Sequence, residues 1–539
     1  MPSSALAGAA IVAIAVLGFF IFPGHTYLQQ DTQIYAPMLE RLSNPGLFTR
    51  ELITSRPHLA WTAYDETALL LRRITSLDFK AVLLGEELVF RVLGLWGVYL
   101  IGRALRFSER ESVLIGGVFA LGATIIGPAV LTFEYEPVPR GFAIMLVFLA
   151  IGLSMTGRVD AAAIAAAAAF LYHAPTAIPF WTVFTIVAAR ARRWRALAAL
   201  GVSVAALATL SCIQPGVVER QPLFSRISPF LERLQRMRAP YNWVSLWNPE
   251  WFVHYALLLG FVIAALCRLR ARLGWSERAL VIGLPLIGAL SLPISYITLE
   301  QMKWSLIPQF QPARAVLFIT AMAVILGAAA AIHASRELRY AETFAWMTIP
   351  FAIPAMILLI PPYKPAAVIV TLALAITATA VLALERARPR VAAAAVLVLT
   401  AGGMLSIPTF AGVRNYPDLW TPDIQDLSRW ARTRTPQDAV FAFPDAGKRL
   451  DPGLFRAEAL RAVYVDWKGG GQANYFEDLA REWWSRWQAV MTPACDWRRF
   501  RQYGIDYIVV RRDHAKPPGI HPVYANGTYV VYPAEAYAR

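Results

Sequence analysis

Hydrophobic residues in this chain gather into long runs that short polar segments separate. Runs of about 18 or more apolar residues are long enough to cross a bilayer as helices. The pattern therefore predicts a mainly α fold, a polytopic transmembrane helical bundle of about thirteen spans. The runs lie near residues 5–22, 81–102, 112–132, 140–156, 161–172, 175–189, 196–213, 252–267, 279–298, 312–332, 343–361, 366–384 and 391–409.

The apolar stretch from Ala161 to Ala189 is too long for one ordinary span. The tetrapeptide from Tyr172 to Pro175 interrupts it. Proline disfavours helical geometry in the residue before it, so we expect two spans here with a break at this tetrapeptide.

Arginines mark one side of the predicted bundle. When the spans alternate, loops on one side hold most of the basic residues, whereas loops 133–139 and 361–365 on the other side hold almost none. Cytoplasmic loops carry such an excess of positive charge. We therefore expect a membrane protein with a cytoplasmic N-terminus and, because the number of spans is odd, a C-terminus on the opposite side, which for a bacterial inner membrane is the periplasm. The basic loop residues are Arg103, Arg106, Arg110, Arg158, Arg190, Arg192, Arg193, Arg195, Arg268, Arg270, Arg272, Arg278, Arg336, Arg339, Arg386, Arg388 and Arg390.

Composition agrees with a membrane protein. Of the 539 residues, 57% are hydrophobic and 16% are charged, and the mean hydropathy is +0.46. Because the net charge of +15 sits mostly in short loops, we expect no nucleic-acid partner. The three cysteines, Cys212, Cys267 and Cys495, are scattered without CxxC spacing, so the sequence predicts neither a disulfide framework nor a zinc site.

Two segments outside the spans are long enough to have structure of their own. The first outer loop, about 23–80, is predicted to contain amphipathic helices near 33–43 and 62–74, of a kind that often lies along a membrane surface. After the last apolar run, the composition becomes that of a soluble domain. We therefore divide the chain into a transmembrane domain, 1–409, and a small periplasmic α/β domain, 410–539.

The C-terminal domain shows short apolar segments that alternate with a helical pattern. We expect strands at Ala439 to Phe443, Ala462 to Asp466 and Ile505 to Arg511, and a Trp-rich helix from Asn474 to Val490. The segment VYANGTYVVY is typical of a hairpin with an Asn-Gly turn. Strands that alternate with helices predict an α/β domain.

Three acidic residues are predicted on the outer side, close to the bilayer. Asp31 follows the first apolar run, and Glu134 and Glu136 lie in the turn FEYEPVPR. A carboxylate just beyond a span stays near the bilayer without burial in hydrocarbon, and there it can act as a base on a lipid-carried substrate. The cationic candidates for binding a phosphate on the same side are Arg140, His173, Lys303 and Arg314.

The acidic candidates also have structural interpretations. Asp31 can cap a helix or lie in a solvated loop. Glu134 and Glu136 can cap the helix expected near Pro139, where carboxylates favour the positive end of the helix dipole.

The cationic candidates have structural interpretations as well. Arg140 can be only an ion-pair partner of the neighbouring acids, and His173 can hydrogen-bond a backbone carbonyl freed by the adjacent proline. Arg314 can extend to lipid headgroups.

The overall layout is similar to that of a known superfamily. An early acid in a long outer loop (Asp31), an acidic second outer loop (Glu134, Glu136), about a dozen spans and a final domain with a YGIDYIVVRR strand resemble the GT-C membrane glycosyltransferases, which use polyprenyl-phosphate-linked sugars. The resemblance implies that Asp31 is the catalytic base or a metal-site acid. It also implies that Glu134 or Glu136 assists and that Arg314 holds the lipid phosphate.

Of the two roles implied for Asp31, that of a metal ligand has less support from the sequence than that of a base. Many GT-C members have a paired acid in the first loop, whereas Asp31 is flanked by Gln30 and Thr32. A divalent cation such as Mg²⁺ or Mn²⁺ usually takes more than one oxygen ligand from the protein. We therefore assign no metal ligands, although the superfamily leaves a divalent metal open.

The resemblance implies an inverting hexosyl- or pentosyltransferase of the bacterial inner membrane. It would move a sugar from a polyprenyl-phosphate carrier, in the presence of membrane lipid, to a glycan, lipid or protein acceptor in the periplasm. A transporter or lipid flippase is an alternative, and it would depend on acids within the spans, such as Glu86 or Glu87. Glu87 and Arg91 can instead neutralise each other at i, i+4. A second alternative is a catalytically inactive GT-C-fold scaffold.

Overall fold

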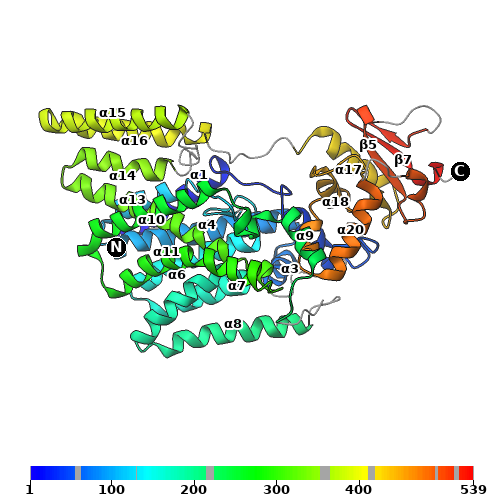
Figure 1. The fold of residues 1–539 in the computed structure, drawn as a ribbon, viewed down its shortest axis with the longest axis horizontal. Coiled ribbons are helices and arrows are strands. Elements are labelled where there is room, and N and C mark those ends of the chain that lie inside the picture. The colour runs from blue at the N-terminus through cyan, green and yellow to red at the C-terminus, as the bar shows by residue number, and fades with distance from the viewer. Residues whose placement is uncertain are drawn as a thin grey trace.

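The molecule consists of a long helical bundle with a smaller strand-containing domain at one end (Figure 1). The computed structural model describes residues 2–54, 62–128, 130–213, 224–352, 365–410, 419–491, 496–514 and 521–537. Cys495 and parts of the segments 23–80, 343–361 and 361–365 lie outside these residues.

The bundle confirms the expected polytopic helical fold. In the described part of the chain, seven helices are long and apolar enough to cross a membrane, and two shorter apolar helices accompany them. The total of about thirteen spans stays a prediction. Together with α4 (Phe79–Ala104), α5 (Glu109–Phe119) and α14 (Tyr340–Ala352), these apolar helices make up the bundle. They are α1 (Pro2–Phe20), α6 (Pro139–Met155), α7 (Val159–Arg190), α8 (Trp194–Ile213), α10 (Pro249–Leu269), α11 (Trp275–Ser295), α13 (Leu317–Arg336), α15 (Pro365–Ala387) and α16 (Pro389–Phe410).

The expected break in the longest apolar stretch is confirmed. Within α7, His173 leaves helical geometry, with φ −159° and ψ 91°. The indole Nε1 of Trp181 donates to the carbonyl of Ala166 at 3.2 Å, although a straight helix would separate these residues by about 22 Å. The two halves of α7 therefore lie side by side. The Thr62 hydroxyl donates to the Tyr172 carbonyl at 2.7 Å, which satisfies a group freed by the break.

The expected span at 112–132 is wrong. Helix α5 ends at Phe119 and is followed by a short antiparallel hairpin of β1 (Thr124–Ile125) and β2 (Val130–Leu131). Gly122, with φ +73°, follows the helix end and donates its amide to the Phe119 carbonyl at 3.1 Å. This left-handed backbone stops the helical pattern that the apolar side chains alone would continue. In the hairpin turn, Gly127 adopts φ +83° against the Trp247 ring, which a Cβ would approach to 2.9 Å.

Helices α4 and α6 pack closely because both present glycine at their contact. A Cβ on Gly152 would lie 2.2 Å from the Gly97 carbonyl oxygen, so the two backbones touch. Small residues allow such approach between membrane helices. The contact fixes α6, which begins at the functional site with Pro139 and Arg140.

The C-terminal domain has the predicted α/β composition. Its mixed sheet has the order β4-β3-β5-β7-β6, in which β3 is parallel to β4 and β5, and β7 is antiparallel to β5 and β6. The predicted strands, Trp-rich helix and Asn-Gly hairpin are all present. The elements are α17 (Pro422–Arg434), β3 (Val440–Ala442), α18 (Asp451–Ala459), β4 (Ala462–Val463), α20 (Glu477–Met491), β5 (Tyr507–Arg511), β6 (Tyr524–Ala525) and β7 (Tyr529–Pro533).

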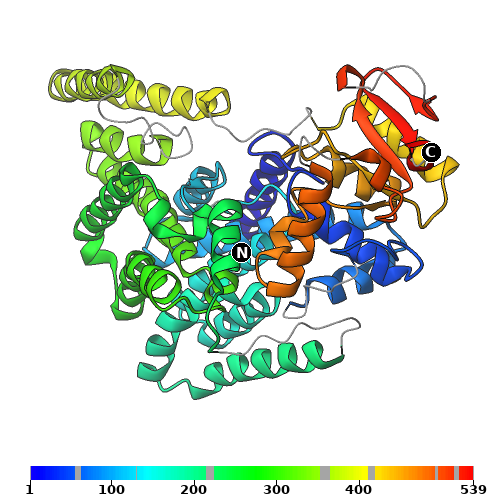
Figure 2. The same cartoon turned by 45° about the vertical axis from the view of Figure 1, so that its right-hand side comes forward.

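The first loop forms the two expected helices, α2 (Thr32–Ser43) and α3 (Tyr64–Thr75). Helix α2 packs against α18 of the C-terminal domain, and a position of α2 and α3 along the membrane surface stays a prediction. A Cβ on Gly453 would lie 2.2 Å from the Gln33 side chain. In both views the blue first loop lies at the same end of the bundle as the orange and red C-terminal domain (Figures 1 and 2).

One buried arginine joins the first loop to the C-terminal domain. The side chain of Arg456 is fully buried, and its Nη1 pairs with Glu51 at 3.0 Å and Asp466 at 2.8 Å. Its Nη2 donates to the Gln33 carbonyl at 3.0 Å. Buried ions are tolerated only when they are paired and hydrogen-bonded in this way.

We expect Arg456→Met to lower the free energy of unfolding by about 3–5 kcal/mol, because it leaves Glu51 and Asp466 buried without their cation. Thermal unfolding of the purified full-length protein in detergent would measure this. Arg429→Met is the matched control, since the Arg429–Asp426 pair is exposed and should contribute less than about 1 kcal/mol. Equal stability of the two variants would contradict the proposed role of Arg456.

Candidate functional site

Asp31 lies at the N-terminus of α2, but it does not cap the helix. It occupies the N-cap position, and its side chain makes no capping hydrogen bond. The Thr32 hydroxyl instead accepts from the Leu28 amide at 2.8 Å, which closes the turn before the helix. The Asp31 carboxylate is therefore directed to other partners.

Glu136 binds the backbone of this turn. Its Oε1 accepts from the amides of Gln29 at 3.0 Å and Gln30 at 2.8 Å, and its Oε2 accepts from the Asp31 amide at 3.0 Å. The Thr32 hydroxyl donates to the same carboxylate. Burial and the nearby charge of Asp31 raise the pKa of Glu136, while the hydrogen bonds from Thr32 and Gln30 oppose the rise. Glu136 thus positions Asp31, and both of its oxygens are engaged.

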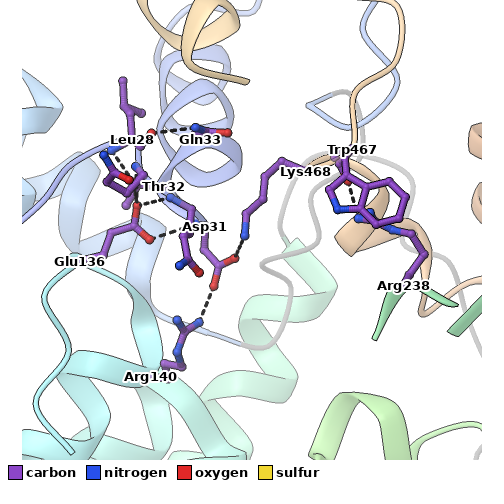
Figure 3. Close-up of polar contacts among 12 residues, drawn as sticks. Leu28, Asp31, Thr32, Gln33, Glu136, Arg140, Arg238, Trp467 and Lys468 are labelled. Carbon is purple, nitrogen blue, oxygen red and sulfur yellow. Dashed lines mark hydrogen bonds and ion pairs between the residues drawn. The ribbon is translucent and has the colours of Figure 1, made fainter. Parts of the chain in front are cut away.

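Two cations flank the Asp31 carboxylate (Figure 3). Oδ2 pairs with Nη1 of Arg140, and Oδ1 pairs with Nζ of Lys468 at 2.6 Å. Burial by itself would raise the pKa of Asp31, but Lys468 and Arg140 outweigh it and hold that pKa well below its usual range. Asp31 is therefore ionised and fully ion-paired.

Arg140 connects Asp31 to the second outer turn. Its Nε donates to Oε1 of Glu134 at 2.9 Å, and the same oxygen accepts from the Leu131 amide at 3.2 Å. Arg140 is the second residue of α6, so the helix start sets its position. Glu134, Glu136 and Arg140 come from one short segment and form one cluster with Asp31.

Arg314 lies beside this cluster. It is within electrostatic range of Arg140, Asp31 and Tyr475. Its Nε is buried and has no hydrogen-bond partner among the residues that the structure describes. Arg314 lines two small cavities.

The larger cavity is apolar along most of its wall. Glu134, Arg140 and Arg314 contribute its charged groups. The remaining lining residues are Val130, Leu131, Ile144, Pro175, Thr176, Pro179, Ala315, Leu317 and Phe318. A space with two partly buried arginines at one part and hydrocarbon side chains elsewhere has groups that suit an anion attached to an apolar chain.

His173 and Lys303 differ in their relation to the site. His173 is within electrostatic range of Arg314 and Arg140, and its Nδ1 accepts from the Thr176 amide at 3.3 Å. Lys303 is not part of the cluster, because its ammonium pairs with Glu232 at 2.7 Å.

Lys468 was not identified from the sequence. It belongs to the C-terminal domain, and proximity across two domains cannot be read from spacing along the chain. The one local signal is the run of three glycines that follows it. A Cβ on Gly469 would lie 2.6 Å from Asp466, and one on Gly470 would lie 2.4 Å from Trp483, so these glycines allow the segment to pack tightly.

The residues of the cluster do not fit a divalent metal in this arrangement. Both oxygens of Asp31 face cations, and both oxygens of Glu136 accept from N–H or O–H donors. In the described part of the chain, no group of three or more His, Cys, Asp or Glu residues could hold a metal ion. A metal would have to displace Arg140 or Lys468 from Asp31, so we derive no step through one.

Comparison with protein families matches one segment of this chain. A family model described as a domain of unknown function, DUF6798, matches residues 422–490, which include Lys468 and run from α17 into α20. No curated protein matches the chain.

Comparison with solved structures finds matches over nearly the full length. ArnT from Cupriavidus metallidurans bound to undecaprenyl phosphate is 14% identical, with a TM-score of 0.45 over 97% of each chain. Arabinofuranosyltransferase AftD from Mycobacteria is 15% identical, with a TM-score of 0.48 over 98% of this chain and 39% of that one. The Archaeoglobus fulgidus oligosaccharyltransferase is 12% identical, with a TM-score of 0.43 over 94% and 68%.

At these identities and TM-scores the likeness assigns no function to this chain, and the roles of individual residues must come from its own geometry.

We expect Glu136→Gln to destabilise the protein by about 1–3 kcal/mol, because the amide cannot accept from all three backbone N–H groups and the Thr32 hydroxyl. Thermal unfolding would measure the change. Glu40→Gln is the matched control, since the Glu40–Arg72 pair is partly exposed and should contribute little. A Glu136→Gln protein as stable as the control would show that the carboxylate does not hold the turn.

Proposed function

We propose that this protein is a membrane glycosyltransferase that transfers a sugar from a polyprenyl-phosphate carrier to an acceptor hydroxyl on the periplasmic side of a bacterial inner membrane. The observation that carries the proposal is the position of Asp31. Its ionised carboxylate pairs with Arg140, and Arg140 and Arg314 both line a cavity whose wall is otherwise mostly apolar. We infer from this that the base, the phosphate ligands and the lipid-binding wall adjoin one another.

The cavity supports a lipid-linked donor. Arg314 has a buried Nε without a partner among the described residues, which is costly unless a ligand completes it. A phosphate oxygen is a suitable acceptor, because arginine binds phosphate through charge-assisted hydrogen bonds. The apolar residues next to it, such as Ile144 and Phe318, suit the first isoprene units of the carrier.

The reaction follows from these positions. The acceptor hydroxyl attacks C1 of the donor sugar, and its proton moves to the Asp31 carboxylate. A C1–O bond to the acceptor forms while the C1–O bond to phosphate breaks, and the electron pair stays on the phosphate oxygen. Arg140 and Arg314 stabilise the charge that develops there. Attack opposite the leaving phosphate inverts the configuration at C1.

The distribution of charge supports the orientation. Arg140 and Arg314 stand at the starts of α6 and α13, whereas Arg336 ends α13, about 30 Å away along the helix. At that far end, arginines pair with acids of neighbouring helices, as Arg268 does with Glu337. An arginine-rich end is typical of the cytoplasmic side, which would place the site in the periplasm.

The transporter alternative receives less support. Glu87 pairs with Arg91, and Arg91 also donates to the carbonyls of Gly24 and Glu134 at 2.8 Å each. This arrangement ties α4 to the segments that carry the site. It gives Glu87, one of the two acids that proton-coupled transport would use, a structural role. The other acid, Glu86, accepts from the Tyr172 hydroxyl at 3.2 Å, and its second oxygen is buried without a hydrogen-bond partner among the described residues.

We expect Asp31→Asn to reduce sugar transfer by about 10²–10⁴-fold, because the amide cannot take the proton of the acceptor hydroxyl. Release of polyprenyl phosphate from a labelled polyprenyl-phosphate sugar, with membranes as the source of acceptor, would measure transfer. Asp426→Asn, an exposed aspartate in the C-terminal domain, is the control and should keep full activity. A fully active Asp31→Asn protein would exclude Asp31 as the base.

We expect Arg314→Met to weaken binding of polyprenyl phosphate by about tenfold or more, because the phosphate loses a charge-assisted hydrogen bond. Equilibrium binding of labelled polyprenyl phosphate to the protein in nanodiscs would test this. Arg339→Met removes an exposed arginine at the opposite end of α13 and serves as the control. Unchanged affinity in Arg314→Met would rule out a phosphate contact.

A further inference from the structure

Lys468 is the one cation of the site that the C-terminal domain supplies. Its ammonium pairs with Asp31 at 2.6 Å, and Asp31 is its single ionic partner among the residues that the structure describes. Arg140, the other cation on Asp31, also pairs with Glu134. Of these two cations, Lys468 has fewer bonds to lose when an anion enters.

The backbone around Lys468 is held in place from several sides. Asp466 binds Arg456, and its other oxygen accepts from the Gly469 amide at 3.0 Å. The ring of Trp467 lies 3.6 Å from the Arg238 guanidinium, which also donates to the Trp467 carbonyl (Figure 3). The lysine therefore extends from a fixed backbone, and its flexible stem carries the charge toward Asp31.

The Asp31 carboxylate is an anion that connects the transmembrane domain to the C-terminal domain. Arg140 from α6 and Lys468 from the C-terminal domain contact its two oxygens. Arg140 also lines the larger cavity. Only the Asp31 carboxylate separates Arg140 from the Lys468 ammonium. A phosphate that reaches Arg140 from this cavity is therefore close to Lys468, and the lysine can release the carboxylate and bind the phosphate.

We propose that Lys468 is a ligand of the donor phosphate, supplied by the C-terminal domain, and that Asp31 holds this lysine in place until the phosphate takes it over. This inference rests on the proposed function. The exchange also frees one oxygen of Asp31 to accept the proton of the acceptor hydroxyl. Donor binding would thus activate the base, and the C-terminal domain would be a working part of the site.

Binding of polyprenyl phosphate to the full-length protein in phosphatidylcholine nanodiscs tests the proposal. We expect Lys468→Met to weaken binding by about tenfold or more and Lys468→Arg to restore most of it, because the charge is restored. Polyprenol, which lacks the phosphate, should bind all variants equally. Lys448→Met is the matched control, because Lys448 lies 4.9 Å from the same Trp467 ring and should leave the affinity unchanged.

A double variant separates direct contact from an indirect effect. If Lys468 only neutralises Asp31, its loss exposes the phosphate to an unpaired carboxylate, and Lys468→Met has no effect once Asp31→Asn has removed that charge. If Lys468 contacts the phosphate, Lys468→Met weakens binding in the Asp31→Asn background at least as much as in the wild type. We expect the second result, and the first would overturn the proposal.

The same experiment distinguishes failure of this inference from failure of the proposed function. If the wild-type protein binds polyprenyl phosphate no more tightly than polyprenol, the glycosyltransferase proposal fails, and the role of Lys468 fails with it. If the wild type prefers the phosphate and Lys468→Met binds it equally well, only the lysine assignment is wrong.

Discussion

The Glu136 carboxylate is the contact on which the geometry of the site depends. Three successive amides, those of Gln29, Gln30 and Asp31, point at it from the turn before α2. Such a concave arrangement of N–H groups binds an anion strongly, and here the anion is part of the protein. Because Asp31 belongs to this turn, the direction of its side chain is set before any cation approaches it.

The short segment that contains Glu136 also supplies the cation that pairs with Asp31. Arg140 follows Glu136 by four positions and starts α6, whose place is fixed by the contact of Gly152 with Gly97 on α4. Helix packing deep in the bundle therefore determines where the guanidinium meets Asp31. The C-terminal domain completes the arrangement through Arg456, which binds the first loop at Glu51. The two domains meet at the site, so the chemistry proposed here belongs to neither alone.

Much of this could be predicted from the sequence, and the remainder shows where sequence reasoning stops. Long apolar runs predict helices because each satisfies its own backbone, and the break at His173 follows from the local effect of proline. The outer-side acids were predicted on one side because the arginine pattern orients the bundle. The hairpin after α5 was missed because the left-handed backbone at Gly127 is not visible in hydropathy. Lys303 and Lys468 look equivalent in the sequence, and only the fold sends one to Glu232 and the other to Asp31.

The balance of charge at the site gives a physical reason for placing a lysine opposite the base. The carboxylates of Asp31 and Glu134 pair with the cations Arg140 and Lys468, and Arg314 lies nearby, so the cluster holds both signs of charge before a ligand binds. A polyprenyl-phosphate sugar adds one negative charge. In the proposed reaction, Asp31 would become neutral by taking a proton, and the departing phosphate would gain the charge that Asp31 lost. The total charge would be unchanged, because the negative charge would move from the carboxylate to a phosphate bound by the same cations. In a site poorly screened by water, such a transfer avoids the cost of creating an uncompensated charge.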